Sequence, residues 1–369
     1  MKYLITGGGT GGHIYPALAI AEEIKSRDQN AEILYVGTKN GLEAELVSRA
    51  GFKFRTIRVK GMPRKINRES FIAFKELLHG LFESNKIIKE FKPDIVVGTG
   101  GYVSGPVVYM AKKRGISAII HEQNAYPGIT NKILSRYVDK VAATFDESKK
   151  YFKYPERVHI TGNPIRKEIG QIKKEDAYRD LAIESKNPFI LSFGGSGGQK
   201  KLNDAIFNLI KDISTNKREI QLIHVTGKRL YDDFIRKLDE SKIILDKNIK
   251  VYPYFYQMPQ ALNIASLVIT SAGAITLAEL AAVGVPSILI PKSYTAENHQ
   301  EYNARVFEQE GASILVLEKD INDEYLNSII YDIVYDSRKL SQMRENCKKL
   351  GKKEASENIY SLLKSLASK

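Results

Sequence analysis

Short apolar segments alternate with amphipathic stretches along almost the whole chain. The apolar segments predict strands, whereas the stretches between them repeat apolar residues at the spacing of a helix. This alternation favours an α/β fold with parallel sheets covered by helices, whose ligands bind beyond the carboxyl ends of the strands. The predicted strands are residues 3–6, 32–36, 95–97, 118–120 and 140–143 in the first half, and 189–193, 221–226, 249–251, 267–270 and 287–290 in the second.

The two halves open alike. The first strand of each half runs into a glycine-rich loop, GGGTGG at residues 7–12 (the first glycine-rich loop) and GGSGG at 194–198 (the second glycine-rich loop). A helical pattern follows each loop, so we expect two tandem Rossmann-like domains whose parallel sheets face each other across a cleft. The polar stretch 161–186 joins them, and residues 358–367 predict a last amphipathic helix.

Composition and charge narrow the functional classes. The chain has 369 residues, 43% hydrophobic and 27% charged, which suits two globular domains and excludes a collagen-like or disordered chain. The net charge is +13, and most of this excess lies in residues 1–165. Such a charge suits nucleic acid, an anionic membrane or a phosphorylated substrate, unless it reflects a generally lysine-rich proteome.

Cysteine content and hydropathy suggest the compartment. A single cysteine, Cys347, permits no intramolecular disulfide and no cysteine-based zinc site, which fits a reducing cytosol. The N-terminal segment lacks the apolar core of a signal peptide, and no apolar run approaches the ~18–20 residues of a membrane span. We therefore expect any contact with a membrane to be at its surface.

The first glycine-rich loop matches the G-x-G-x-x-G pattern, which alone is a weak signal. A dinucleotide site would need an acidic residue at the end of the second strand, where Val36, Gly37 and Thr38 stand instead, so a nicotinamide or flavin cofactor is disfavoured. His13 follows the loop in the first helical turn. As a neutral imidazole near the positive end of a helix it is a candidate general base, the alternative being a packing or capping histidine.

Other polar clusters follow predicted strands. The second glycine-rich loop fails the P-loop pattern but can hold a phosphate through backbone N–H groups and the Ser196 hydroxyl. The third glycine-rich loop, residues 98–106, brings its backbone close to a ligand or to the first loop. Residues 121–124 (HEQN) are poor core material and predict a role in the cleft. A metal site is not expected, because the other histidines are scattered and no Asp-x-Asp pair is present.

Two further segments carry candidate chemistry. Glu279 lies three residues after Thr276 on one helical face, where a carboxylate can accept the ribose hydroxyls or can simply be a surface group. Residues 297–300 (ENHQ) suit sugar hydroxyls. Residues 71–82 repeat apolar side chains at helical spacing next to basic residues, which fits either core packing or docking on anionic lipid.

Taken together, these motifs resemble the MurG family, the peptidoglycan N-acetylglucosaminyltransferases of bacteria. The resemblance rests on residues 8–13 (GGTGGH), 100–106 (GGYVSGP), 121–124 (HEQN), 161–166 (TGNPIR) and 273–279 (GAITLAE). It implies the glycosyltransferase B fold, with residues 1–162 facing acceptor and membrane, 163–350 binding UDP-GlcNAc, and 351–369 forming a helix that returns to the first domain.

The reaction implied is an inverting transfer of GlcNAc from UDP-GlcNAc to the C4 hydroxyl of MurNAc in undecaprenyl-pyrophosphoryl-MurNAc-pentapeptide (lipid I), giving lipid II. It would take place without a cofactor at the cytoplasmic face of the cell membrane, beside other cell-wall synthesis proteins. A glycolipid synthase of the same fold that uses another UDP-sugar remains open. A nucleic-acid binder is disfavoured, because basic tails and RNA-stacking motifs are absent from the sequence.

The motifs and the resemblance together suggest the site residues. His13 is the first candidate for the base and Glu122 the second. The expected donor-site residues are Thr10, Gly11, Gly12, Asn124, Arg166, Ser196, Phe255, Ala274, Ile275, Thr276, Leu277, Ala278, Glu279 and Gln300. The expected acceptor-side residues are Gly101, Tyr102, Ser104 and His121. The expected membrane-facing residues are Arg64, Lys65, Arg68, Phe71, Phe74, Leu78 and Phe82.

Three positions depart from the family pattern. Gly197 and His299 each stand where a glutamine is common, and the arginine often found just before Gly273 is absent. These changes put single side-chain contacts with the donor in doubt. They do not affect the expected phosphate binding, since backbone N–H groups supply most of its hydrogen bonds.

Overall fold

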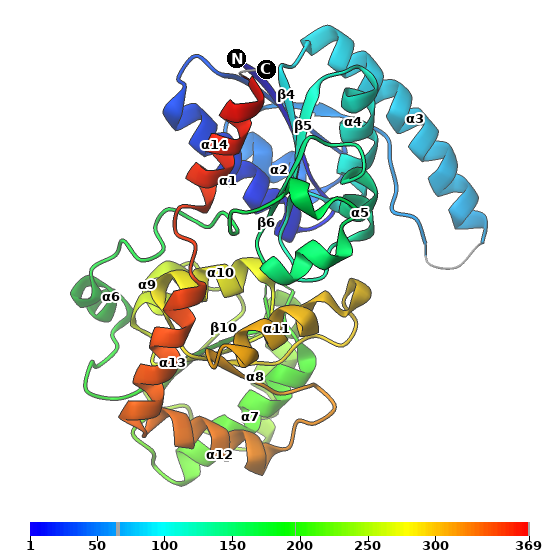
Figure 1. Cartoon of the computed structure of the whole chain (residues 1–369). Helices are drawn as coiled ribbons and strands as arrows, with labels where there is room; N and C mark the ends of the chain where they lie inside the picture. Colours follow the sequence, from blue (N-terminus) through cyan, green and yellow to red (C-terminus); the bar gives the residue numbers. More distant parts are fainter. Residues whose placement is uncertain (64–66, 196, 368–369) are drawn as a thin grey trace. The chain divides into compact units, whose positions relative to one another are not determined.

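The computed structural model describes residues 1–63, 67–195 and 197–367. Its internal contacts divide the chain into two compact units (Figure 1). Unit 1 comprises Met1–Ile165 and Lys352–Lys369, and unit 2 comprises Arg166–Gly351.

Unit 1 is built on a seven-stranded parallel sheet with the order β3-β2-β1-β4-β5-β6-β7. Its strands are β1 (Lys2–Thr6), β2 (Glu32–Gly37), β3 (Lys53–Thr56), β4 (Ile95–Gly98), β5 (Ser117–Glu122), β6 (Lys140–Ala143) and β7 (Val158–Ile160). Its helices are α1 (Gly11–Arg27), α2 (Leu42–Arg49), α3 (Arg68–Phe91), α4 (Gly101–Lys113), α5 (Ile129–Leu134) and α14 (Ala355–Ala367).

Unit 2 has a six-stranded parallel sheet with the order β10-β9-β8-β11-β12-β13. Its strands are β8 (Phe189–Phe193), β9 (Gln221–Val225), β10 (Ile249–Tyr252), β11 (Leu267–Thr270), β12 (Ser287–Leu289) and β13 (Ser313–Leu315). Its helices are α6 (Lys174–Leu181), α7 (Lys200–Thr215), α8 (Tyr231–Glu240), α9 (Met258–Ile264), α10 (Ala274–Val283), α11 (His299–Gln309), α12 (Asp323–Val334) and α13 (Ser337–Leu350). If the strands of each unit are numbered in chain order, both sheets have the order 3-2-1-4-5-6, and unit 1 adds a seventh strand at the end.

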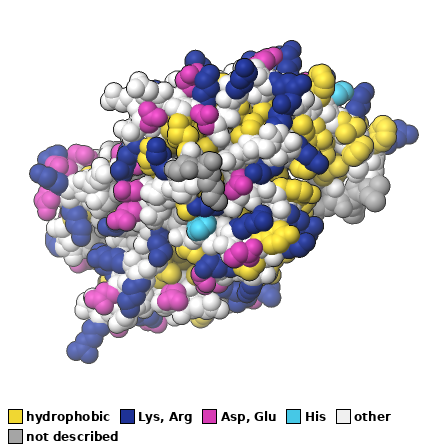
Figure 2. All heavy atoms as spheres, turned by 45° about the horizontal axis from the view of Figure 1, so that its top comes forward, with side chains coloured by type: hydrophobic (Ala, Val, Ile, Leu, Met, Phe, Trp, Pro, Cys, Tyr) yellow, Lys and Arg dark blue, Asp and Glu magenta, His cyan; other side chains and the backbone are white. Residues whose placement is uncertain are grey.

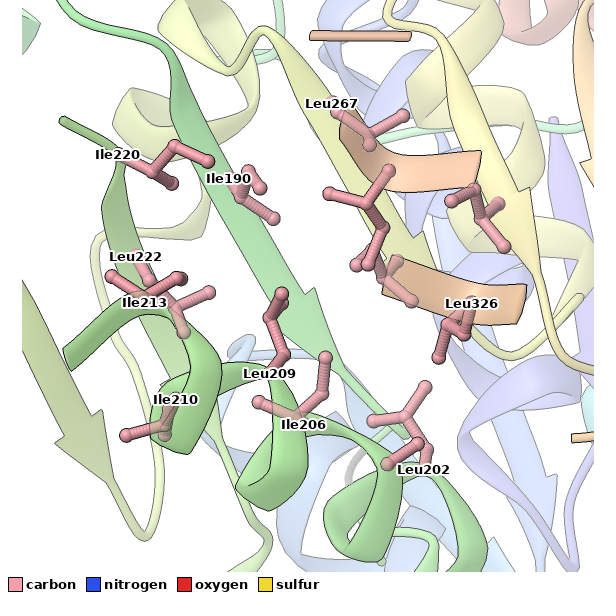
Figure 3. Close-up of a cluster of buried hydrophobic side chains, with 14 of the residues drawn as sticks. Ile190, Leu202, Ile206, Leu209, Ile210, Ile213, Ile220, Leu222, Leu267 and Leu326 are labelled. Atoms are coloured by element: carbon pink, nitrogen blue, oxygen red, sulfur yellow. The ribbon is translucent and has the colours of Figure 1, made fainter. Parts of the chain in front are cut away.

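The hydrophobic clusters that cover the sheets explain why apolar segments such as β1 and β8 form central strands. In β1, Leu4 packs in one hydrophobic cluster and Ile5 in another, because successive side chains of a strand point to opposite faces of the sheet. Ile359 and Leu363 of α14 complete the second of these clusters. In unit 2, the apolar side of α7 covers the sheet and packs against Ile190 of β8, as Figure 3 shows.

The predicted fold class is confirmed, and each predicted strand is present. The strands at 140–143, 189–193 and 267–270 have the predicted ends, and the other predicted strands differ by one or two residues at an end. Three strands were missed: β3, β7 and β13. All three lie at sheet edges. An edge strand is buried on fewer sides, so it does not need the continuous apolar run that marks a central strand. The sequence of β3, KFRT, has largely exposed side chains and carries no such run.

The strand order fixes where ligands can bind. In each sheet the chain moves outward in both directions from a central pair, β1 and β4 in unit 1 and β8 and β11 in unit 2. Loops at the carboxyl ends of such a pair diverge and leave a crevice. The first and third glycine-rich loops follow β1 and β4, and the second follows β8.

Candidate active site

The first and third glycine-rich loops of unit 1 pack directly against each other. A Cβ atom on Gly7 would lie 2.0 Å from the Thr99 hydroxyl oxygen, and one on Gly101 would lie 2.2 Å from the Gly8 carbonyl oxygen. Side chains at these two positions would therefore collide with the neighbouring loop. Gly101 also has a φ of +76°, a conformation that other residues rarely adopt.

Glu43, at the start of α2, is a site residue that the sequence analysis missed. Its buried carboxylate accepts hydrogen bonds from the Thr38 N–H and hydroxyl at 3.0 and 2.6 Å, and from the Gly9 N–H at 3.3 Å. A Cβ atom on Gly8 or Gly41 would approach this carboxylate to within 2.7 Å. The Glu43 side chain therefore points into the fold, where its hydrogen bonds fix the backbone of the first glycine-rich loop.

His13 lies in the first turn of α1, as predicted. Its Nδ1 is 3.1 Å from the Gly8 carbonyl oxygen and 3.1 Å from the Thr10 hydroxyl. Because a carbonyl oxygen can only accept, Nδ1 carries the hydrogen, and Nε2 is the basic nitrogen of the neutral ring. Thr10 is the N-terminal cap residue of α1, and Gly11 and Gly12 begin the helix, where the first N–H groups have no partner within the helix.

The cluster at residues 121–124 differs from the prediction, because three of its four side chains are buried. His121 uses both ring nitrogens: Nε2 is 3.0 Å from the Gly162 carbonyl oxygen and Nδ1 is 3.0 Å from the Gln123 amide nitrogen. The carbonyl accepts, so Nε2 carries the hydrogen and Nδ1 accepts from Gln123. Burial lowers the pKa of His121 to about 4, which keeps the ring neutral.

Glu122, the second base candidate, is also buried. Its carboxylate accepts hydrogen bonds from the Asn124 and Gly128 backbones at 3.0 and 3.2 Å, and from the Asn131 side chain at 2.8 Å. Burial raises the pKa of Glu122, and these hydrogen bonds oppose that effect. The arrangement ties the segment after β5 together, so the geometry favours a positioning role for Glu122 over proton abstraction. The Asn124 side chain also donates to Glu122, at 3.2 Å, and remains partly accessible.

The predicted acceptor-side residues fall into two groups. Tyr102 is partly exposed, and a Cβ atom on Gly9 would lie 3.0 Å from its ring, so the ring flanks the first glycine-rich loop. Ser104 is buried and donates to the Gly101 carbonyl oxygen at 3.0 Å. Ser104 and His121 therefore stabilise the backbone from inside, while Tyr102 can reach a ligand.

In unit 2, Gln199 lies between the second glycine-rich loop and α7. Gln199 is buried, and its amide group donates to the Ile290 carbonyl oxygen at 3.0 Å and to Glu318 at 2.8 Å. These bonds fix the start of α7 to the chain after β12. Ser196 lies outside the described residues, so its predicted role stays a prediction.

Arg166 and Glu279, both predicted to meet UDP, pair with each other. The guanidinium donates two hydrogen bonds to the carboxylate, at 2.8 and 3.0 Å. Burial raises the pKa of Glu279, and Arg166 opposes this. Arg166 is partly exposed, so the pair presents a fixed cation at the surface of unit 2.

The remaining donor-site predictions differ in accessibility. Phe255 is buried against Tyr252, with ring centroids 5.1 Å apart, and Leu277 belongs to the core. Ile275, Thr276 and Ala278 of α10 are partly accessible, whereas Ala274 is nearly buried. Gln300 is buried, and its side-chain oxygen accepts the backbone N–H of Lys292 at 3.0 Å. Leu277 and Phe255 can therefore shape a donor site only through the backbone or from beneath it.

Helix α3 carries the predicted membrane-facing residues, apart from Arg64 and Lys65, which lie outside the described residues. Phe71 and Phe82 are 76% and 71% exposed, and Phe74 and Leu78 are also exposed, so these side chains are not core. The opposite side of the helix, with Ala73, Ile87 and Ile88, is buried. Figure 2 shows hydrophobic side chains gathered beside Lys and Arg side chains on this part of the surface.

No helix in residues 1–63, 67–195 or 197–367 combines the length and apolar character needed to cross a bilayer. Within the same residues, His, Cys, Asp and Glu side chains form no group of three or more that could hold a metal ion.

Comparison with known proteins defines the class first. Residues 3–143 match the glycosyltransferase family 28 N-terminal domain, and residues 189–359 match the glycosyltransferase family 28 C-terminal domain. These matches include the first and third glycine-rich loops in unit 1 and the second in unit 2. Two parallel-sheet Rossmann-like units with these domains define a glycosyltransferase of the B fold.

Full-length relatives define the family. The chain is 49% identical over 99% of its length to all of the UDP-N-acetylglucosamine--N-acetylmuramyl-(pentapeptide) pyrophosphoryl-undecaprenol N-acetylglucosamine transferase of Thermoanaerobacter sp. (strain X514). It is 50% identical to the Finegoldia magna enzyme of the same name, over 97% of this chain and 96% of that one. The crystal structure of Acinetobacter baumannii MurG is 27% identical, with a TM-score of 0.78 over 99% of both chains. The chain therefore belongs to the MurG family.

Proposed function

We propose that this protein transfers GlcNAc from UDP-GlcNAc to the C4 hydroxyl of the MurNAc residue of lipid I, giving lipid II for peptidoglycan synthesis. The observation that carries the proposal is identity of about half the residues, over almost the full length, to transferases named for this donor and acceptor. The position of His13 beside the first glycine-rich loop supports it.

The chemistry is a single displacement at the anomeric carbon. The acceptor oxygen forms a bond to this carbon from the face opposite the diphosphate, and the bond from the carbon to the β-phosphate oxygen breaks. The bonding electron pair leaves with UDP, and the proton of the acceptor hydroxyl passes to a base. The configuration of the sugar is inverted.

His13 is the base in this proposal. Its Nδ1–H bond to Gly8 leaves Nε2 as the basic nitrogen, so the tautomer suits proton abstraction. The exposed loop residues Gly9 and Thr10 beside His13 would meet sugar groups.

The donor binds to unit 2 in this proposal. The second glycine-rich loop and the start of α7 offer backbone N–H groups to the diphosphate. Arg166 adds a cation held by Glu279, and the partly accessible side of α10 would border the ribose. These groups offset the charge that develops on departing UDP.

Unit 1 would dock on the cytoplasmic surface of the membrane through α3. Phe71, Phe74, Leu78 and Phe82 are exposed, and Arg68 and Lys75 lie on the same helix. An exposed apolar face next to basic residues binds anionic bilayers through burial of the apolar side chains and attraction to the headgroups. Docking would bring the enzyme to an acceptor that is itself lipid-linked.

The decisive experiment is an assay of GlcNAc transfer from UDP-GlcNAc to a lipid I analogue. We expect a disaccharide product with an inverted linkage to the C4 hydroxyl, identified by mass spectrometry and NMR. In a parallel reaction, UDP-glucose with diacylglycerol should give no product. Glycolipid formation without transfer to the lipid I analogue would overturn the proposal.

A further inference from the structure

We propose that Lys292 is a binding residue for the diphosphate of the donor, contacting its phosphate oxygens beside the second glycine-rich loop. The inference rests on the proposed function, since it assumes a uridine diphosphate sugar as donor. It concerns a residue that no sequence motif singled out.

The Lys292 side chain reaches the loop directly. Its ammonium group donates to the Gly198 carbonyl oxygen at 2.9 Å. A Cβ atom on Gly195 would lie 3.9 Å from this ammonium nitrogen and 3.8 Å from the Ser271 hydroxyl. Gly195 therefore leaves room between a cation and a hydroxyl group, at the carboxyl ends of the central strands β8 and β11.

The backbone of this segment is fixed against the loop. The Lys292 N–H donates to the Gln300 side-chain oxygen at 3.0 Å. Glu318 accepts from the Gln199 side chain at 2.8 Å and from the Ser293 N–H at 3.0 Å. One carboxylate thus ties Gln199, just after the second glycine-rich loop, to the residue after Lys292, and so fixes the backbone from which the Lys292 side chain extends.

The local charges favour an anionic ligand. An ammonium group has three N–H donors, and Gly198 takes one of them. Burial lowers the pKa of Lys292, which indicates that its charge is incompletely solvated. Arg229 flanks the loop at Gly197, where a Cβ atom would lie 3.7 Å from its guanidinium. Glu318 is the acid that attracts Lys292, and its two carboxylate oxygens already accept hydrogen bonds.

The experiment compares the affinities of UDP and uridine, which differ by the diphosphate. Lys292→Gln keeps a donor for Gly198 and removes the charge. We expect it to weaken UDP binding by about 10- to 100-fold in calorimetry while leaving uridine binding unchanged, because hydrogen bonds to charged groups contribute that much. Lys319→Met serves as the matched control, since it removes an exposed lysine on the groove beyond Glu318 and should bind both ligands as the unaltered protein does.

Three outcomes would overturn the inference. Equal losses of UDP and uridine affinity would mean that Lys292 supports the loop and not the diphosphate, and unchanged UDP affinity would mean that it does neither. Lys292→Arg keeps the charge and should retain most of the UDP affinity, so a loss as large as that of the glutamine variant would also contradict the role of charge. Failure of the unaltered protein to bind UDP would instead overturn the proposed function.

Discussion

The first and second glycine-rich loops occupy the same place in the same strand order, yet their surroundings have opposite charge. The first loop is held by the buried carboxylate of Glu43. The second is contacted by the ammonium group of Lys292. A carboxylate beneath a loop repels a diphosphate, whereas a cation attracts it. Two similar sequence motifs therefore suit different ligands, an uncharged sugar group at the first loop and an anion at the second.

One glycine of the second loop, Gly195, has more room beside it than the glycines of the first loop. In the first loop, Gly7 and Gly8 make room for protein side chains, those of Thr99 and Glu43. In the second loop, a Cβ on Gly194 or Gly198 would likewise collide with Gln199 or with the Thr226 carbonyl oxygen, whereas one on Gly195 would make contacts of 3.8 Å or more. A G-x-G-x-x-G pattern thus does not indicate a phosphate site unless the space beside its glycines is open.

The largest expected effect separates chemistry at the first loop from donor binding at the second. His13→Ala should lower kcat for GlcNAc transfer by about 10²- to 10⁴-fold, because the general base is lost. UDP affinity should stay unchanged, the reverse of the result expected for Lys292→Gln. Steady-state kinetics at saturating substrates, with UDP calorimetry alongside, measures both quantities.

A matched control for this variant is His159→Ala, which removes a partly buried imidazole from β7 of the same unit. We expect it to retain near-normal kcat. If His13→Ala also kept near-normal kcat, the base would have to be another group. The contrast between catalysis beside the first glycine-rich loop and donor binding at the second would then fail.

The next largest effect is on membrane binding, which should differ between the two units, since only unit 1 is proposed to dock on lipid. Phe71→Ser combined with Phe82→Ser should weaken binding to vesicles of anionic phospholipid by about 100-fold, as two phenylalanines no longer enter the bilayer. Vesicle sedimentation measures the partition. The control is Ile244→Ser in unit 2, where the side chain is 88% exposed and should not matter. Equal binding by all three proteins would show that another surface contacts the membrane.

How much the sequence could predict depended on the kind of signal. Central strands and glycine-rich loops were found because burial on both faces demands apolar runs and tight turns demand glycine. The edge strand β3 was missed because its side chains are largely exposed. His121 and Glu122 were expected to reach a ligand, but they are satisfied by Gly162, Gln123 and Asn131 inside the fold. Polarity alone does not reveal whether such partners exist.

Glu43 and Lys292 show a second limit of sequence reasoning. The dinucleotide pattern places its acid at the end of the second strand, whereas Glu43 stands on the following helix and reaches back to Thr38. Lys292 lies far from the second glycine-rich loop in sequence, and the pairing of β12 with β11 and of β11 with β8 brings it near. Contacts between separate loops depend on tertiary structure, so no local pattern predicts them.

The pH dependence of stability should be alike in the two units. Burial lowers the pKa of His121 in unit 1 to about 4 and that of His224 in unit 2 to about 3, both from 6.5. Below pH 6.5 the unfolded chain binds these protons before the folded chain does, so stability falls as the pH drops towards 4 and is fully present above 6.5. At pH 5 each histidine should lower the unfolding free energy by about 2 kcal/mol.

Hydrogen exchange at pH 7 and pH 5, read separately for peptides of each sheet, measures this effect. His121→Asn should reduce the acid sensitivity of unit 1 and leave that of unit 2 unchanged, whatever its effect on stability at pH 7. Acid sensitivity that is unaltered in unit 1 would show that its stability in this range depends on other groups.

The smallest expected effect is on stability, and it tests whether Glu43 holds the first glycine-rich loop. Glu43→Gln should destabilise unit 1 by about 1–2 kcal/mol, because the amide nitrogen would face the N–H of Gly9 or the donors of Thr38 and leave one of them unsatisfied. Faster hydrogen exchange of residues 7–12 should accompany it, with UDP affinity unchanged. The matched control is Glu45→Gln on the same helix, which loses only an exposed pair with Arg49. If both variants exchanged alike, the buried carboxylate would not hold the first glycine-rich loop, and its difference from the second would rest on Lys292 alone.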